Sequence, residues 1–304
     1  MRRLKVSHIT TYNYANPVRF GDHRMMFRPR DSHDLRILLT RLSITPKPVA
    51  LRWLHDVFGN SVAIASFDAE ATALRFESDI LLQHFEVEEP DTPIEEYARI
   101  YPFRYPDAEI PDLESLIAPQ YPDSERLLES WTKSLVSAGG YSDTWDMLGQ
   151  MTRAIHHDIA YQARDAEGLQ SPAETLTLRT GSCRDLAVLM MEAVRALGFA
   201  ARFVSGYLYA PNIDGAGNIG GGATHAWTQI YLPGSGWVEF DPTNGIVGNR
   251  DLIRVAVARD PNQAVPLRGT WTGAPGDFLG MQVEVAVKAV FDDAEPERNA
   301  GGNV

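Results

Sequence analysis

The order in which hydrophobic periodicities follow one another constrains the fold of this 304-residue chain more than any other feature. Up to about residue 88, apolar residues come in short alternating runs, such as 35–39 and 61–65, which are typical of β-strands. Seven prolines then interrupt residues 90–122 and indicate a connecting segment. Helical spacing follows, and strand-like runs return after residue 200. We therefore expect an α+β protein that begins with an antiparallel β domain.

The same patterns predict individual elements. Helices are expected at 123–137, at 142–159 and from Ser171, where an N-cap serine is followed by proline and then glutamate at the third helical position. Strands are expected at 202–204, 225–232, 237–240, 253–257 and 282–289. The resulting division is a β-rich domain at 1–90, a proline-rich connection at 91–122, a second domain at 123–291 and a disordered, charged tail at 292–304.

The one cysteine of the chain, Cys183, lies at the start of a predicted amphipathic helix. Over 186–197 the apolar residues recur at the three-and-four spacing of one helical face, and a glycine follows as a stop. Ser182 is a suitable N-cap, and Asp185 resembles a shortened capping box. The thiol therefore lies on the first helical turn, where unpaired N–H groups and the helix dipole favour an anion. A lone buried cysteine is usually just a small apolar residue, whereas this position also suits a nucleophile.

A histidine and an aspartate further along complete a set that can perform chemistry. His225 opens the strand predicted at 225–232, a Pro-Gly-Ser-Gly turn follows, and the returning strand ends at Asp241. In an antiparallel hairpin the beginning of one strand lies beside the end of the next, about 4.8 Å away, so these two residues are expected to meet. His225 can then take the proton of Cys183 and later return it, while Asp241 orients the ring. Each residue alone has an ordinary structural explanation, and it is the combination that indicates catalysis.

Several segments resemble the bacterial transglutaminase-like family, which belongs to the papain-like superfamily of thiol enzymes. In the second half of the chain they are residues 181–185, 197–207, 224–227 and 240–244, with 253–260 and 266–269 similar to the family's C-terminal stretch. Residues 12–14, 17–18, 28–29 and 56–60 resemble the family's N-terminal β-rich domain. The resemblance implies a papain-like second domain, with helices packed on an antiparallel sheet and the nucleophile at a helix N-terminus.

The resemblance also implies a reaction. Cys183 would attack an amide or isopeptide carbonyl and form a thioester acyl-enzyme, with His225 as general base and then acid and Asp241 as its orienting residue. We expect hydrolysis, as by a cysteine protease or amidase, to be favoured. The alternatives are transfer of a glutamine acyl group to an amine, and a non-catalytic peptide-binding module that retains the fold. For the oxyanion, the Cys183 backbone N–H is one donor and Tyr161 is the side-chain candidate. The family commonly has glutamine after the nucleophile, whereas this chain has Arg184, which should favour the thiolate and alter the neighbouring pocket.

The composition limits which binding partners and which cellular compartment we expect. A net charge of −12 argues against nucleic acid and anionic membranes as main partners. A single cysteine excludes an internal disulfide and a thiolate zinc cluster, no calcium loop is present, and we expect neither cofactor nor metal. No apolar run follows the basic first residues, so we expect a cytoplasmic protein, in which the thiol stays reduced. The resemblance implies a peptide, protein or small amide substrate, and an association with ATP-grasp-like peptide-bond enzymes.

Two further features receive ordinary interpretations. His156 and His157 are adjacent, and neighbouring side chains diverge by about 100° on a helix, so we interpret them as a solvated helix end rather than as metal ligands. The three glycines at 220–222 lack a phosphate-loop pattern and are expected to let the loop after Tyr209 move over the site.

Overall fold

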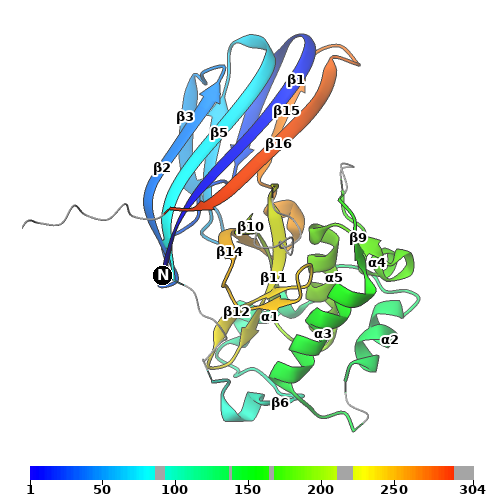
Figure 1. The fold of residues 1–304 in the computed structure, drawn as a ribbon. Helices are drawn as coiled ribbons and strands as arrows, with labels where there is room; N and C mark the ends of the chain where they lie inside the picture. Colours follow the sequence, from blue (N-terminus) through cyan, green and yellow to red (C-terminus); the bar gives the residue numbers. More distant parts are fainter. Residues whose placement is uncertain (86–92, 137–138, 164–167, 211–221, 291–304) are drawn as a thin grey trace, which may run out of the picture.

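The computed structural model describes residues 1–85, 93–136, 139–163, 168–210 and 222–290. Within them the chain forms a long, curled antiparallel sheet and a second, smaller sheet beside which the helices gather (Figure 1). The expected α+β class is confirmed. Most of the loop predicted to move over the site, at 211–221, and the tail at 292–304 lie outside the described residues.

The first sheet has the strand order β2-β5-β1-β4-β3, with β15 and β16 also paired to β1. Side chains along β1 and β5 alternate between buried and partly exposed positions, because successive residues of a strand point to opposite faces. The strands of this sheet are β1 (Arg2–Met25), β2 (Leu35–Thr45), β3 (Ala50–His55), β4 (Ser61–Ser66), β5 (Glu70–His84), β15 (Leu267–Thr272) and β16 (Phe278–Ala289).

The two C-terminal strands join the first sheet and not the second. β16 pairs with β1 from Leu4 opposite Ala289 to Tyr14 opposite Phe278, and β15 pairs with the later part of β1. The expected division, which placed this stretch in a second domain ending at 291, is therefore wrong here. Alternation at 282–289 predicts a strand, but a period of two says nothing about the partner. The partner is the otherwise uncovered edge of the long strand β1.

The second sheet is antiparallel and has the order β13-β12-β11-β10-β14. Its strands agree with those predicted between residues 202 and 257, apart from shifts at their ends. They are β10 (Ala201–Leu208), β11 (His225–Leu232), β12 (Gly236–Asp241), β13 (Ile246–Val247) and β14 (Leu252–Ala258). The helices are α1 (Ile110–Ile117), α2 (Leu127–Ser134), α3 (Thr144–Asp158), α4 (Pro172–Leu178) and α5 (Cys183–Ala196). Two short strand pairs lie among them: β6 (Ile100–Tyr101) pairs with β7 (Ser142–Asp143), and β8 (Ala160–Tyr161) pairs with β9 (Thr180–Gly181).

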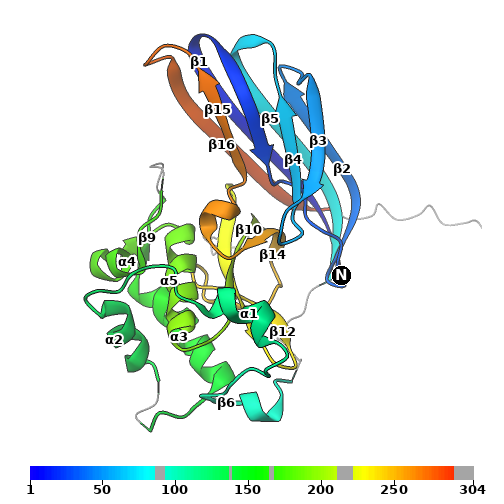
Figure 2. The ribbon, with the colours of Figure 1, turned by 180° about the vertical axis from the view of Figure 1, so that it is seen from behind.

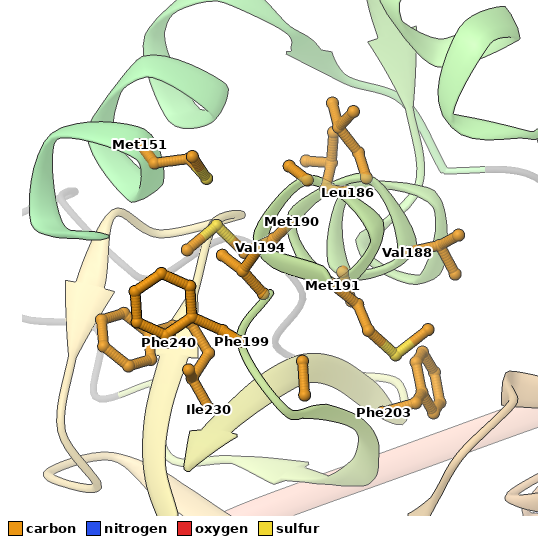
Figure 3. Close-up of a cluster of buried hydrophobic side chains, with 14 of the residues drawn as sticks. Met151, Leu186, Val188, Met190, Met191, Val194, Phe199, Phe203, Ile230 and Phe240 are labelled. Atoms are coloured by element: carbon orange, nitrogen blue, oxygen red, sulfur yellow. The ribbon is translucent and has the colours of Figure 1, made fainter. Parts of the chain in front are cut away.

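Helix α5 is the centre of the main core. Figure 3 shows its side chains Leu186 and Met191 pointing in different directions, the latter toward Phe203 of the sheet. The expected helix with one apolar face is therefore wrong, because α5 is covered on every side over 185–195. Burial of its charged residues is tolerated because they are paired: the Arg195 guanidinium donates to the Glu192 carboxylate at 2.7 Å.

The proline-rich connection contains a packed helix rather than plain linker. Pro111 lies in the first turn of α1, where the missing N–H has no intrahelical partner to lose, so this proline starts the helix and does not break it. Leu113 and Leu116 of α1 are buried beside Ala200.

The first sheet lies against the second sheet (Figure 2), and Val6 of β1 shares a buried cluster with Val255 of β14. Along β11 the side chains alternate, Ala226 toward the α5 core and Trp227 into a separate cluster with Phe58 of the first domain. The side chain of Asn60 clamps the backbone of Val257, donating to its carbonyl at 2.7 Å and accepting from its N–H at 2.9 Å. The helix layer and the β domain thus hold the second sheet between them.

Candidate active site

The first turn of α5 is fixed by a buried carboxylate. Asp185 accepts from the backbone N–H of Ser182 at 2.9 Å and from its hydroxyl at 2.7 Å. Its other oxygen accepts from the backbone N–H of Gln170 at 2.8 Å. This is the capping arrangement expected from the sequence, and it sets the direction in which the chain enters the helix at Cys183. The Cys183 side chain is 9% exposed.

The hairpin of β11 and β12 brings the predicted histidine and aspartate together. His225 Nε2 lies 2.8 Å from Asp241 Oδ2, and both side chains are fully buried. The carboxylate is further held by the Thr243 backbone N–H at 3.0 Å and by the Asn244 amide at 2.7 Å. Burial alone would raise the pKa of Asp241, but His225 and these two donors outweigh it and lower that pKa. The aspartate is therefore an anion.

The second ring nitrogen of His225 is not held by Asp241. Nδ1 is buried and has no hydrogen-bond partner among the residues that the structure describes. Burial alone would lower the pKa of His225, but the Asp241 carboxylate, with smaller contributions from the neighbouring Cys183 thiol, raises that pKa above its usual value. Cys183 and Asp241 therefore both lie near the ring of His225.

Trp227 supports the histidine from one side. Its ring stacks on the imidazole of His225, with centroids 5.9 Å apart, and its indole N–H donates to the buried carboxylate of Glu239. Glycine is required beside it on β10, because a Cβ at Gly206 would lie 2.6 Å from the Trp227 ring and 2.2 Å from a backbone oxygen of β14. Trp227 is fully buried, so it holds His225 and contributes nothing to a surface groove.

The structure gives His156 a role that the sequence did not indicate. Its Nδ1 donates to the backbone carbonyl of Thr243 at 2.8 Å, so it is not the solvated helix end that we expected. His157 beside it is exposed. No group of three or more His, Cys, Asp or Glu side chains in the described part of the chain is arranged to hold a metal ion.

Tyr161 and Arg184 are the two other residues that the sequence singled out near Cys183. Parallel pairing of β8 with β9 puts Tyr161 beside Gly181, two residues before the cysteine. Burial raises the pKa of the half-buried Tyr161, Cys183 adds to this and Arg184 opposes it, so both groups are near the phenol. Arg184 is half-buried, and no carboxylate in the described ranges forms an ion pair with it.

None of the described helices has both the length and the apolar content needed to cross a membrane.

Comparisons with known proteins identify both parts of the chain. Residues 4–83 match the bacterial transglutaminase-like N-terminal region, and residues 132–242 match the transglutaminase-like superfamily. An uncharacterised protein of Mycobacterium tuberculosis is 27% identical over 306 residues, covering 93% of this chain and 92% of that protein. A protein-glutamine gamma-glutamyltransferase of Pseudomonas aeruginosa is 35% identical over 105 residues, covering 33% of this chain and 16% of that protein.

A solved structure shares the whole architecture. The crystal structure of a candidate cysteine protease from Cytophaga hutchinsonii superimposes with a TM-score of 0.68 at 21% identity, covering 97% of this chain and 93% of that chain. Both parts of the fold therefore occur together in another protein, with the β domain preceding the transglutaminase-like core. On these matches, the chain joins a bacterial transglutaminase-like N-terminal region to a domain of the transglutaminase-like superfamily.

Proposed function

We propose that the protein is a thiol enzyme that hydrolyses an amide or isopeptide bond through a thioester on Cys183. The observation that carries the proposal is the buried Nδ1 of His225, which has no hydrogen-bond partner among the described residues while Nε2 is held by Asp241. A histidine fixed in this way accepts a proton at one defined atom. The raised pKa of His225 favours its protonated form, which is the form that results when Nδ1 takes the proton of the thiol.

The reaction then follows from the positions of these atoms. The Cys183 proton passes to His225 Nδ1, and the thiolate sulfur bonds to the carbonyl carbon of the substrate. The carbon–nitrogen bond breaks as Nδ1 gives its proton to the leaving amine, and a thioester remains. A water molecule attacks that thioester and returns a proton to Nδ1, and then the carbon–sulfur bond breaks. The acid product leaves and the thiol is restored.

Two donors are proposed for the oxyanion. The Cys183 backbone N–H is at the free N-terminus of α5, where it has no intrahelical partner. The Tyr161 hydroxyl, close enough for its pKa to respond to the thiol, is the side-chain candidate. Donors of this kind act where charge develops in the transition state.

Water is the proposed acceptor, because nothing in the described residues marks a site for an amine. Water is present at about 55 M, so a transferase must exclude it and bind the amine. Likeness to a glutamine gamma-glutamyltransferase supports the competing possibility of transfer. A cytoplasmic location belongs to the proposal as well, since a reducing compartment keeps the thiol of Cys183 free.

The test incubates glutamine-containing and isopeptide-containing donors with the enzyme, with and without a primary amine, and resolves products by mass. We expect the hydrolysed acid to dominate without calcium, and the Cys183→Ala variant to form no product. Amine adducts in excess of acid at millimolar amine would establish transfer instead. A reactive thiol with no product from any donor would show that the substrate class is wrong.

A further inference from the structure

The curl of the first sheet brings its two end strands together on either side of a groove. β2 and β3 are at opposite ends of the strand order, yet both views of the ribbon show them next to each other (Figures 1 and 2). Ile37 of β2 and Trp53 of β3 line one cavity of about 440 Å³, and Leu42 and Leu51 line a second of about 280 Å³ beside it. In the described part of the sheet these two strands share no backbone pairing.

Strand β3 is an unprotected edge. It pairs with β4 on one side only, and every one of its six residues is exposed. Three of them are large and apolar: Leu51 is 42% exposed, Trp53 48% and Leu54 38%. Edge strands are normally covered or carry charges, because their free N–H and C=O groups can pair with another chain. An edge this apolar is therefore suited to accept an added strand.

The walls of the groove are cationic. Arg28 lines both cavities, Arg30 lines the first and Arg41 lines the second, while Asp31 is the one acidic lining residue. Among the described residues, neither Arg28 nor Arg41 forms an ion pair. Residues 1–85 contain twelve Lys and Arg against eight Asp and Glu, although the whole chain has a net charge of −12. Positive charge is thus concentrated in the domain that contains the groove.

We propose that the groove between β2 and β3 binds an extended acidic peptide, which adds as a strand to β3. Its backbone would pair with the free edge, alternate apolar side chains would contact Leu51 and Trp53, and its carboxylates would lie beside Arg28 and Arg41. A peptide fits better than a nucleic acid, because the free edge offers alternating N–H and C=O groups that pair with a peptide backbone and not with a sugar–phosphate chain. If the bound peptide is part of a substrate for Cys183, that step rests on the proposed function. Binding of the peptide to the groove does not.

Binding is measured with the full-length Cys183→Ala protein, so that no turnover occurs. The probe is a fluorescently labelled peptide of alternating Glu and Val, followed by anisotropy at low and at moderate salt. We expect saturable binding that weakens with salt, and a loss of at least about tenfold in affinity for Arg28→Glu with Arg41→Glu. Arg104→Glu, an exposed arginine of the connecting segment, is the matched control and should change affinity less than about twofold.

Two further probes separate the binding mode. The same peptide with alternate backbone amides methylated keeps its charge but cannot pair with a strand edge, so it should bind at least about tenfold more weakly. Equal binding of the methylated peptide, no binding of either peptide, or stronger binding of a single-stranded oligonucleotide would each overturn the proposal. Arg28→Glu should leave the alkylation of Cys183 in the otherwise wild-type enzyme unchanged, so failure here is distinct from failure of the proposed function.

Discussion

The imidazole of His156 donates from Nδ1 to the carbonyl oxygen of Thr243 at 2.8 Å, and so ties helix α3 to the turn that follows Asp241. The N–H of the same Thr243 donates to the Asp241 carboxylate at 3.0 Å. His156 thus acts on the cluster through one intervening residue. Under the proposed function, His156 would therefore be a positioning residue and not a catalytic one.

Replacing this histidine should slow the reaction without weakening substrate binding. We expect His156→Phe to lower kcat about fivefold to tenfold with KM little changed, because one net hydrogen bond is worth about 1 kcal/mol. His156→Gln, which can still donate, should recover part of the loss. The exposed neighbour His157 gives the matched control, His157→Phe, with wild-type kinetics. Equal kinetics for the two Phe variants would show that the hydrogen bond does not position Asp241.

The meeting of His225 and Asp241 was predictable, whereas the contact of His156 was not. A hairpin with a recognisable turn fixes which residues lie opposite each other, and so the sequence is sufficient. The partner of His156 is a backbone carbonyl 87 residues away, and a carbonyl has no residue type that could reveal it. The contact of Asn244 with Asp241 was only partly predictable. The two residues lie in the same turn, but the amide of Asn244 could equally have bonded to its own backbone.

In the fold, too, features set by neighbouring residues were predictable, whereas features set by residues distant in the sequence were not. Helix α4 begins as its capping residues predict, because Ser171 and Glu174 satisfy each other's backbone N–H groups. The pairing of β16 with β1 joins opposite ends of the chain, and nothing in the alternation of either strand specifies the other. The burial of Glu192 and Arg195 was not predictable either, because charged side chains on a helix usually indicate the face that is exposed to solvent.

The thiol of Cys183 should react faster than an ordinary buried thiol because His225 lies beside it. We expect iodoacetamide to alkylate the wild-type protein at pH 7 at least about tenfold faster than the His225→Ala variant, since the imidazole can take the proton of the thiol. Cys183→Ala should abolish turnover and leave Tm almost unchanged. Equal alkylation rates in the wild type and in His225→Ala would contradict an activated nucleophile.

The orienting role of Asp241 predicts a ranking of its variants. Asp241→Asn retains an oxygen that can accept the ring N–H of His225, whereas Asp241→Ala leaves His225 and Asn244 without their buried acceptor. We expect kcat to fall by about 10²–10⁴ in the alanine variant and to be at least about tenfold higher in the asparagine variant. Steady-state kinetics, measured together with thermal melts, distinguish this loss of kcat from unfolding of the variants. Wild-type rates in both variants would mean that another acceptor holds the ring.

The contact between the two parts of the fold should weaken in acid. Burial lowers the pKa of His8 to about 4, and its Nδ1 lies 2.9 Å from the Tyr207 hydroxyl. The unfolded chain therefore takes up a proton from about pH 6.5 downward, while the folded protein does not until about pH 4. Stability falls across that window, by up to about 3 kcal/mol.

The non-titrating variant His8→Gln should flatten this loss. The measurement is the free energy of unfolding from urea titrations at intervals between pH 7 and pH 4. We expect a shallower slope for His8→Gln, while His55→Gln, which changes an exposed histidine of β3, should retain the wild-type slope. Identical slopes in all three proteins would show that His8 does not govern the acid response.

The half-buried cation beside the nucleophile should select substrates that carry a carboxylate. Arg184 follows Cys183 directly and has no ion-pair partner in the described part of the chain, so a substrate carboxylate would supply the missing charge. We expect Arg184→Gln to raise KM about tenfold for a peptide with a free carboxylate near the scissile amide. For the matched carboxamide peptide, KM should hardly change, because neither protein can form the ion pair with it. The difference between the two peptides isolates the charge from any general damage to the site, and an equal rise in KM for both would assign Arg184 a structural role instead.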